Sequence, residues 1–496
     1  MTDASLDASL DPDRLDDALL ARWRVALRAA AYDDVFLARC EAIAPRMLDA
    51  VRLPVVVWWL RTQQHPAAAL ARLWAYGDAV DDAALRAALE PGPREGLVDE
   101  LADAGALHRT DEGWCSALRL LPFAGLLVAS DPMHAPDPVM GPGATTQQLV
   151  QALGERPGPR VLDVGCGAGS LALVAAARGA AEVVGVDLHP RAARWSRLNA
   201  ALNGLTLELH TGDLTAPVRG RTFDLVVAQP PFVIKPPDVE ATTYLHGGAM
   251  GDELTMRLVS ELPSVLAPGG EARILFDSPV RAEAPLWRRL QDAHGDDELQ
   301  QLVFATPGLS PELQAIGYAA NGHPALGPAY ADAARRYRAH LHAQGIERCE
   351  HALAVLRRGS PGLSVTVERA SLAGVTDEVI AQTWRAVMVA SQPEARLRAT
   401  TVGLPPEAWL VQEQALDGSE ARLILRLPPG RGGDQVLSDA AALLVDQLRE
   451  PIAVGALVER YASACELSAA DVGPGVVDFV RQSLVAGRLV ATAEDA

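Results

Sequence analysis

Seven short apolar runs alternate with helical patterns between residues 143 and 358, and this alternation is the strongest constraint on the fold. Strands that are separated by helices run parallel, because each helix returns the chain to the edge from which the previous strand started. We therefore predict an α/β fold with a doubly wound, seven-stranded sheet that is covered by helices on both faces. The predicted strands are Arg160–Val164, Glu182–Asp187, 206–210, Phe223–Ala228, 271–276, 300–304 and 352–356.

A mainly helical segment, residues 15–130, precedes this core. Its last part has the pattern of a winged-helix-like module, with helices at 81–89 and 94–105 and strands at 107–109 and 114–121. Nucleic-acid contact and a packing, dimerisation or lid role are the two interpretations. We favour the second, because Glu95, Glu100 and Asp103 in the expected recognition helix have the wrong sign for phosphates.

Residues 131–142 are rich in proline and glycine and mark a domain boundary. We expect a helical, winged-helix-like N-terminal domain at 1–132, the core at 133–360 and an α+β C-terminal domain at 361–496. The expected C-terminal elements are a strand at 363–369, a hairpin at 409–427 turning at 417–418, helices at 438–449, 454–464 and 476–486, and a closing strand at 488–491. The end of this domain also resembles a winged helix.

The chain carries 63 acidic and 44 basic side chains, which gives a formal charge of −19. This balance disfavours nucleic acid as a general partner, since sequence-blind binding needs a basic surface, but it does not exclude a local basic patch.

Five scattered cysteines without a CxxC pair indicate reduced thiols in a cytoplasmic protein. The acidic N-terminus is unlike a secretory signal, and the longest apolar run, 120–129, is too short to span a membrane.

A glycine-rich loop follows the first predicted strand and opens a helix. Gly165, Gly167 and Gly169 permit a sharp turn and the close approach of a ligand, which a side chain would obstruct. The G-x-G-x-G spacing after Asp163 suits an adenosine that carries an amino-acid tail. Cys166 lies within this loop, and we expect its thiol to pack rather than to act as a nucleophile.

Acidic residues follow the next two predicted strands. Asp187, followed by Leu188, lies about 20 positions after the loop, where a carboxylate can accept hydrogen bonds from both ribose hydroxyls. A solvated strand-end carboxylate is the alternative, and it does not account for this offset. Asp213 is placed to accept a hydrogen bond from an adenine amino group while Leu214 packs on the ring. A helix cap is the alternative role for Asp213.

The fourth predicted strand leads directly into Gln229, Pro230, Pro231 and Phe232. Two consecutive prolines fix an extended backbone and lack N–H donors, which leaves carbonyl oxygens directed outward. The amide oxygen of Gln229 and the carbonyl of Pro230 could accept both hydrogens of an incoming NH₂ group, while Phe232 stacks on a planar acceptor. A rigid loop that ends a buried strand is the alternative.

Together, residues 163–169, Asp187, Asp213 and 229–232 resemble the motifs of class I S-adenosylmethionine-dependent methyltransferases. The resemblance is closest to the branch with an Asn-Pro-Pro-Tyr/Phe motif, which includes release-factor glutamine methyltransferases and small-domain RNA guanine N2 methyltransferases. It implies a cofactor, S-adenosylmethionine, and a reaction that needs no metal.

Further segments, 138–146, 199–204, 244–252 and 266–270, match the same branch. The resemblance implies that Thr145 and Thr146 lie in a segment that closes over the cofactor, and that 244–252 is a flexible loop. Within that loop we expect His246 to be a surface residue rather than a catalytic one. The flanking domains are similar only in architecture to those of a large, actinobacterial-type group of methyltransferases.

One residue departs from the branch motif, since Gln229 stands where Asn, Asp or Ser is usual. Its additional methylene displaces the amide oxygen by about 1.5 Å. A shift of ~1 Å can lower a rate about 100-fold, so either the neighbouring backbone compensates, the acceptor differs or activity is lost.

We expect N-methylation of an amide or amine on a peptide, a protein side chain or a small metabolite. An RNA base N-methyltransferase and an inactive cofactor-binding regulator are the alternatives.

Overall fold

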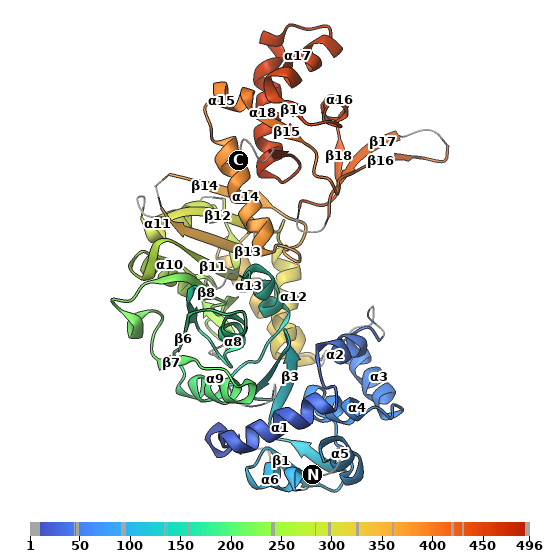
Figure 1. Cartoon of the computed structure of the whole chain (residues 1–496), viewed down its shortest axis with the longest axis vertical. Helices are drawn as coiled ribbons and strands as arrows, with labels where there is room; N and C mark the ends of the chain where they lie inside the picture. Colours follow the sequence, from blue (N-terminus) through green and yellow to red (C-terminus); the bar gives the residue numbers. More distant parts are fainter. Residues whose placement is uncertain are drawn as a thin grey trace.

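The chain is arranged in three parts along the long axis of the molecule (Figure 1). N-terminal helices and hairpins lie at one end, a large sheet with its helices lies in the middle, and the C-terminal helices lie at the other end. The computed structural model describes residues 10–491 except 44, 46–48, 91–95, 133–134, 136, 156–157, 240–243, 283, 296–298, 324–326, 360–361, 418–420 and 429–430.

The N-terminal part consists of short helices and two hairpins. Its helices are α1 (Asp17–Ala29), α2 (Asp34–Glu41), α3 (Asp49–Arg61), α4 (Pro66–Leu70), α5 (Asp82–Leu89) and α6 (Leu97–Asp103), with 3-10 and π turns at Pro12–Arg14 and Ala71–Ala75. Its antiparallel hairpins are β1 (Leu107–Thr110) with β2 (Gly113–Ser116), and β3 (Arg119–Phe123) with β4 (Leu126–Ser130). The strand predicted at 114–121 is thus divided between two hairpins, because the Ser116 hydroxyl bonds the backbone of Leu118 and turns the chain.

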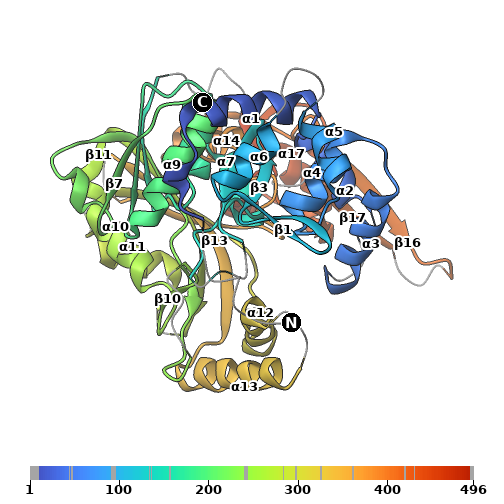
Figure 2. The same ribbon diagram turned by 90° about the horizontal axis from the view of Figure 1, so that it is seen from below.

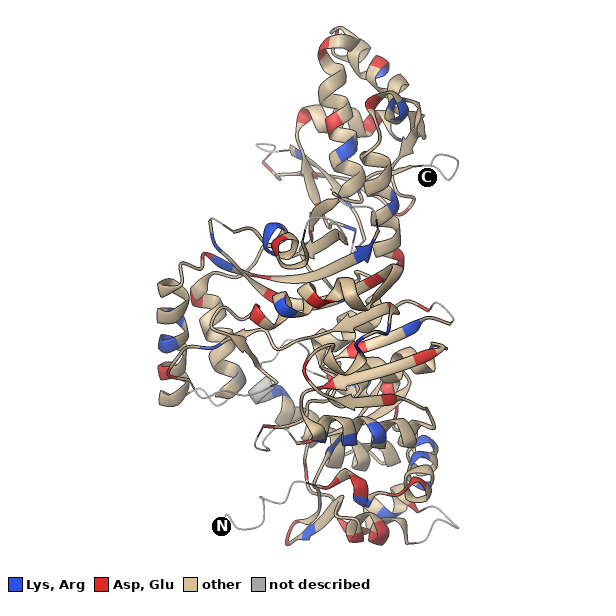
Figure 3. Cartoon of the chain, turned by 90° about the vertical axis from the view of Figure 1, so that its left-hand side faces the viewer, with Lys and Arg blue, Asp and Glu red and all other residues tan. Residues whose placement is uncertain are grey.

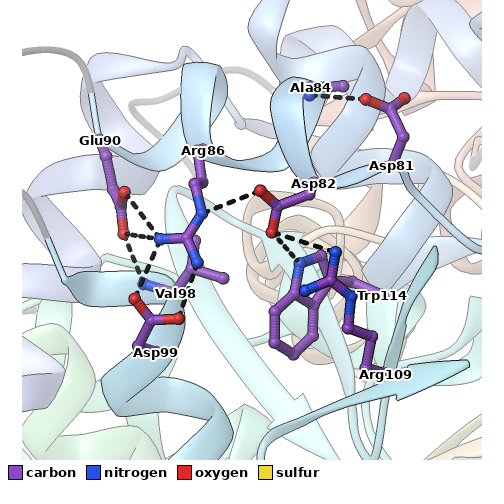
Figure 4. Close-up of polar contacts among 9 residues, drawn as sticks. All are labelled: Asp81, Asp82, Ala84, Arg86, Glu90, Val98, Asp99, Arg109 and Trp114. Carbon is purple, nitrogen blue, oxygen red and sulfur yellow. Dashed lines mark hydrogen bonds and ion pairs between the residues drawn. The ribbon is translucent and has the colours of Figure 1, made fainter.

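An arginine-centred network fixes α5, α6 and the first hairpin to one another (Figure 4). Arg86 bonds Asp82 and Glu90 of its own helix region, and its two Nη atoms bond the two oxygens of Asp99 at 2.7 and 3.1 Å. Trp114 of β2 donates to Asp82 at 2.8 Å. Arg86 is therefore surrounded by carboxylates of its own segment instead of remaining available to a polyanion.

The expected recognition helix, α6, also contacts α1. Arg22 of α1 bonds Glu100, and Arg14 donates to the Asp103 carbonyl at 2.6 Å. Glu95 lies outside the described residues, and α6 begins at Leu97, three residues after the predicted start. These contacts favour the packing role over nucleic-acid contact.

An eight-stranded sheet in the order β14-β12-β13-β11-β8-β5-β6-β7 forms the centre of the molecule. Its strands are β5 (Arg160–Val164), β6 (Glu182–Asp187), β7 (Glu208–Thr211), β8 (Phe223–Ala228), β11 (Leu266–Val280), β12 (Leu299–Ala305), β13 (Arg348–Arg358) and β14 (Ser364–Glu368). All run in one direction except β13, which is antiparallel to both neighbours. All seven predicted strands are present. The eighth, β14, is the strand that we expected in the C-terminal domain.

Helices cover both faces of this sheet. They are α7 (Ala144–Ala152), α8 (Ser170–Ala177), α9 (Pro190–Asn203), α10 (Glu253–Val265) and α11 (Leu286–His294). Consecutive residues of β5 face opposite sides: Val161 packs in the cluster that contains Trp195 of α9, and Leu162 in the cluster that contains Leu258 of α10. Such near-continuous burial is typical of a parallel strand between two helical layers.

An insertion projects from the core beside a short two-stranded sheet (Figure 2). It contains α12 (Pro311–Gly322) and α13 (Pro328–Ala343), and the sheet pairs β9 (Val233–Ile234) with β10 (His246–Gly248) in parallel. Val233 and Ile234 pack in one cluster with Tyr318 of α12 and Tyr337 of α13. The insertion therefore covers the chain that follows the proline motif.

The C-terminal part combines helices with two small sheets. Its helices are α14 (Asp377–Ala390), α15 (Glu394–Ala399), α16 (Asp439–Gln447), α17 (Val454–Ala464) and α18 (Ala469–Val485). One sheet joins β15 (Thr401–Gly403) to β19 (Ile452–Ala453) and β20 (Val490–Ala491); the other contains β16 (Trp409–Gln414), β17 (Ala421–Arg426) and β18 (Gln435–Leu437). The predicted hairpin is present and projects to one side (Figure 1), with Gly418 of its turn outside the described residues.

Acidic and basic residues are interspersed over all three parts of the chain (Figure 3). Among the helices that the structure describes, none is long and apolar enough to cross a membrane.

Two asparagines of α9 join the N-terminal part to the core. Asn199 accepts a hydrogen bond from Ala129 N and donates to the carbonyls of Ala129 and Ala168, each at 2.8 Å. One turn later, Asn203 accepts from Leu127 N at 3.0 Å and donates to its carbonyl at 2.7 Å. Four helical residues span about 6.0 Å and two strand residues about 6.8 Å. The two amides therefore act as a neighbouring strand along the edge of β4.

We predict that Asn199→Ala lowers the free energy of unfolding by about 2–4 kcal/mol, because it leaves three backbone groups without partners in a fully buried place. Asn203→Ala removes similar bonds at a half-buried position, where water can replace them, and should cost less. Urea denaturation of both variants checks the order, and an equal or larger loss in Asn203→Ala would contradict it.

Candidate active site

The glycine loop and the proline motif leave adjacent strands at the same edge of the sheet. β5 and β8 are parallel neighbours, and Val164 at the end of β5 is level with Ala228 at the end of β8. The strand order reverses between these two strands, since β6 and β7 lie beyond β5 while β11 lies beyond β8. Ligands of doubly wound sheets bind at the carboxyl ends of the strands at such a reversal. The two motifs therefore border one candidate crevice.

The glycine loop is held against the end of β6. Gly165 N and Cys166 N both donate to the Val186 carbonyl, at 2.8 and 3.1 Å. Gly169 has a φ of +83° and begins α8, and a Cβ there would lie 2.8 Å from Ser196 Oγ. Glycine is needed at this position for both reasons. The Cys166 thiol is buried, and burial raises its pKa, which agrees with the expected packing role.

Asp163 lies beneath the loop instead of on its surface. Its side chain is almost fully buried and accepts a hydrogen bond from Ala172 N in the first turn of α8, at 3.0 Å. Burial raises its pKa to about 7, the Ala172 bond opposes this rise, and the nearby Asp187 charge adds to it. Asp163 therefore orients the helix that starts at the loop. Direct contact with a cofactor stays a prediction.

Asp187 turns its carboxylate toward the glycine loop. One oxygen accepts from Gly167 N and the other from His189 N, both at 2.9 Å. The next side chain, Leu188, is 61% exposed although it is apolar. The structure thus places a carboxylate and an exposed apolar side chain together beside the loop, and these are the groups that a ribose and an adenine ring require.

Asp213 and Leu214 follow β7, one strand farther from the loop. The exposed Asp213 carboxylate accepts from Arg257 Nη2 of α10 at 2.7 Å. Leu214 has a φ of +46° and is buried in the cluster beneath the sheet. The structure therefore does not bring these two side chains into contact with the other predicted cofactor residues, and their roles stay predictions.

The Gln229 amide bonds the start of α7. Its Nε2 donates to Thr145 Oγ1 at 2.5 Å, and its Oε1 accepts from Thr146 Oγ1 at 3.3 Å. The segment before α7 also contacts the glycine loop, since Ala168 N donates to the Met140 carbonyl at 3.3 Å. Thr145, Thr146 and Gln229, which were predicted from separate motifs, therefore meet. The additional methylene of Gln229, which displaces its amide relative to the asparagine of the branch motif, thus places the amide against α7.

The backbone after the two prolines is fixed by the segment expected to be a flexible loop. Val233 N donates to the Leu245 carbonyl at 2.9 Å, and β9 pairs with β10. A Cβ at Gly247 would lie 2.3 Å from the Pro231 carbonyl, so only glycine allows this close packing. His246 bonds the Tyr337 hydroxyl of α13 at 3.1 Å. The segment 244–252 thus lies directly beside the proline motif, and its flexibility stays a prediction.

Three polar residues near Phe232 were missed by the sequence analysis. The His351 ring lies 6.4 Å from the Phe232 ring between centroids, in an edge-on arrangement. His351 bonds Asp277 at 2.8 Å and Gln148 at 2.9 Å. These residues come from β13, β11 and α7, and no spacing along the chain links them. The only local signal was a polar residue at the end of each of two apolar strands.

The family model for the methyltransferase small domain matches residues 142–298. The release factor glutamine methyltransferase of Deinococcus radiodurans is 39% identical over 128 residues, which are 24% of this chain and 46% of that protein. The ribosomal RNA small subunit methyltransferase C of Alcanivorax borkumensis is 39% identical over 138 residues, 28% of this chain and 37% of that protein. The ribosomal protein uL3 glutamine methyltransferase of Bradyrhizobium diazoefficiens is 32% identical over 155 residues, 28% and 49% respectively. The chain spans less than half the length of each.

We predict that Asp163 makes the protein less stable as the pH rises. Its folded pKa of about 7 exceeds the ordinary 3.8, so the folded state binds more protons between these values than the unfolded state does. The stabilisation is complete below the ordinary pKa and is lost as the pH rises through about 7. Asp163→Asn keeps an oxygen for Ala172 N without a charge and should reduce this loss, by at most about 4 kcal/mol.

Urea denaturation between about pH 5 and pH 8 measures the effect. Asp224→Asn is the control, because Asp224 is exposed at the other end of the sheet and Arg160 lowers its pKa. An unchanged pH dependence in Asp163→Asn would contradict the assignment.

Proposed function

We propose that this chain, in which residues 142–298 match the family model for the methyltransferase small domain, is an S-adenosylmethionine-dependent N-methyltransferase. One observation carries the proposal: the glycine loop and the Gln229–Pro230–Pro231–Phe232 segment leave adjacent parallel strands at the same level and the same edge. A cofactor at the loop and an acceptor at the proline motif would then be neighbours.

The donor set fits the adenosyl part of the cofactor. Asp187 offers carboxylate oxygens for ribose hydroxyls, Leu188 offers exposed apolar surface for the adenine ring, and the loop glycines leave room for the amino-acid tail. When bound, the cofactor supplies a methyl group on a sulfonium, which is already activated for transfer. The protein has to align the acceptor and exclude water.

The proline motif fits a nitrogen acceptor. The Pro230 and Pro231 carbonyls belong to a backbone segment without N–H donors, and Gln229 has further hydrogen-bonding capacity beyond its bonds to α7. Phe232 can stack on a planar group. The acceptor class that these groups support is an amide or amine of a peptide, a protein side chain or a small metabolite.

An RNA base is the second candidate acceptor, because one of the relatives is named as a ribosomal RNA methyltransferase. Two observations favour the first candidate. The chain carries a formal charge of −19, and Arg86 of the segment predicted to be winged-helix-like is engaged by three carboxylates of that segment.

We predict that Asp187→Ala weakens S-adenosylmethionine binding about 10- to 100-fold, which corresponds to the loss of one or two hydrogen bonds to a charged group. Isothermal titration calorimetry measures the affinity. Asp224→Ala, a carboxylate on the opposite end of β8, is the matched control and should bind normally. Equal affinities in the two variants, or a wild-type protein that binds no cofactor, would refute the proposed site.

We predict that labelled methyl groups pass from S-adenosylmethionine to the protein or small-molecule fraction of a cell extract. Fractionation after incubation with the protein, with and without ribonuclease, identifies the acceptor class. Label that appears only in RNA would replace our first candidate with the second. Cofactor binding without transfer to any fraction would instead favour the inactive regulator.

A further inference from the structure

A chain of three side chains borders the proline motif on the side away from the glycine loop. Asp277 Oδ1 lies 2.8 Å from His351 Nδ1, and His351 Nε2 lies 2.9 Å from Gln148 Oε1. Gln148 is one helical turn after Thr145, which bonds Gln229 at 2.5 Å. The histidine is therefore connected to the proline motif through α7 and also contacts it through Phe232.

The register of the sheet places this chain at the acceptor side. β11 is parallel to β8 with Ile274 level with Ala228, the last residue of β8, and Asp277 lies three residues farther along β11. His351 lies directly opposite Asp277 in the antiparallel pair of β11 and β13. β11 and β13 thus extend past the end of β8 and carry the two side chains alongside the proline motif.

Asp277 is held firmly, while the histidine is accessible. The second oxygen of Asp277 accepts from Gln314 Nε2 at 3.2 Å and from the Tyr318 hydroxyl at 3.4 Å, both on α12. The His351 side chain is 23% exposed. A carboxylate that is anchored on one side and bonded to an imidazole on the other fixes the ring orientation and its tautomer.

The position of hydrogen on the ring follows from these partners. A carboxylate oxygen only accepts, so Nδ1 carries a hydrogen, and Nε2 is the atom that gains or loses a proton. The Gln148 oxygen faces Nε2, where it can accept a hydrogen bond from the protonated ring. When the ring is neutral, rotation of the amide by half a turn would let the Gln148 NH₂ group donate to Nε2 instead. A neutral Nε2 has one lone pair, so Gln148 must release it when Nε2 takes a proton from an acceptor, and the Gln148 oxygen can then accept a hydrogen bond from the protonated ring.

We propose that His351, oriented by Asp277, is the catalytic base of the acceptor site and that the acceptor is a primary amine, which is protonated in neutral solution. This proposal rests on the proposed methyltransferase function. A carboxamide nitrogen carries no proton that must be removed before attack, whereas an ammonium has no lone pair until a base has taken one.

The proton balance is simple. Nε2 of the neutral ring takes one proton from R–NH₃⁺, which leaves R–NH₂ and an imidazolium beside the Asp277 carboxylate. The nitrogen lone pair then forms the N–CH₃ bond, the C–S bond electrons remain on sulfur, and R–NH₂–CH₃⁺ is the product. The imidazolium later returns its proton to water.

Few other titratable groups face the ring. Among the described residues, β11 contributes Asp277, α12 contributes Tyr318 and β13 contributes Cys349. Burial raises the pKa of Tyr318 and of the Cys349 thiol, the latter to about 12, so neither titrates near neutral pH. The segment 229–232 and Gln148 contribute uncharged groups. Burial raises the pKa of Asp163 on the cofactor side to about 7, so a change in rate near neutral pH is assigned to the histidine only by its loss in His351→Gln.

We predict that His351→Gln lowers methyl transfer about 100-fold or more and that Asp277→Asn lowers it about 10- to 100-fold, with S-adenosylmethionine affinity unchanged in both. Wild-type transfer should decline at acid pH, and His351→Gln should lose this dependence. His342→Gln is the matched control, because His342 is also paired with a carboxylate, Glu312 at 3.0 Å, but on the exposed surface of α13. It should retain wild-type activity.

Two further measurements separate this role from a structural one. Nitrogen-15 NMR of the ring, assigned by its loss in His351→Gln, should show hydrogen on Nδ1 in the wild type and a changed tautomer in Asp277→Asn. Acid hydrolysis of the labelled product should leave involatile N-methylamines. Volatile methylamine indicates a carboxamide acceptor and overturns the proposal, as does normal transfer in His351→Gln. Absence of cofactor binding would instead overturn the proposed function itself.

Discussion

A single buried amide, that of Asn199, holds together three segments that are far apart in the sequence. It bonds both backbone groups of Ala129 at the end of the N-terminal part and the carbonyl of Ala168 in the glycine loop. Side-chain amides can do this because they offer a donor and an acceptor in one rigid plane, as a peptide group does. The position of the loop therefore depends on the N-terminal part as well as on the sheet. This dependence gives the flanking part a physical role in building the site without any contact with a substrate.

Gln229 shows how a departure from a family pattern can be absorbed by the surrounding fold. The amide donates to Thr145 and accepts from Thr146, so its orientation is fixed by two hydroxyls of opposite roles. One hydrogen on Nε2 and one lone pair on Oε1 remain beyond these bonds. The residue can therefore anchor α7 over the crevice and still accept one hydrogen from an acceptor nitrogen.

The sequence was sufficient for the features that depend on local pattern. The seven strands and the methyltransferase recognition are confirmed, because buried parallel strands are continuous apolar runs and because the loop glycines have no substitutes. The sequence was insufficient to predict contacts between residues that are far apart along the chain. The strand at 364–368 resembled part of the next domain, since nothing in its own residues indicates that β12 is its partner. Ser116 ended a strand through its hydroxyl, a contact that hydrophobic periodicity does not contain. Asp277 and His351 were missed because an antiparallel register brings them together, although 67 residues separate the end of β11 at Val280 from the start of β13 at Arg348.

Charge gives one further link between the two halves of the crevice. The glycine-loop side contains Asp163, whose burial and proximity to Asp187 raise its pKa to about 7, and the acceptor side contains Asp277. A buried carboxylate in such surroundings is stabilised in its charged form by a nearby cation. The sulfonium and the ammonium tail of the cofactor are cations, and so is a primary amine before it loses its proton. In a protein with a formal charge of −19, the long-range field and the local carboxylates would attract both of the proposed reactants, whereas a phosphate backbone would be repelled by both. The acidic composition therefore disfavours RNA as an acceptor and also favours cationic ligands on both sides of the site.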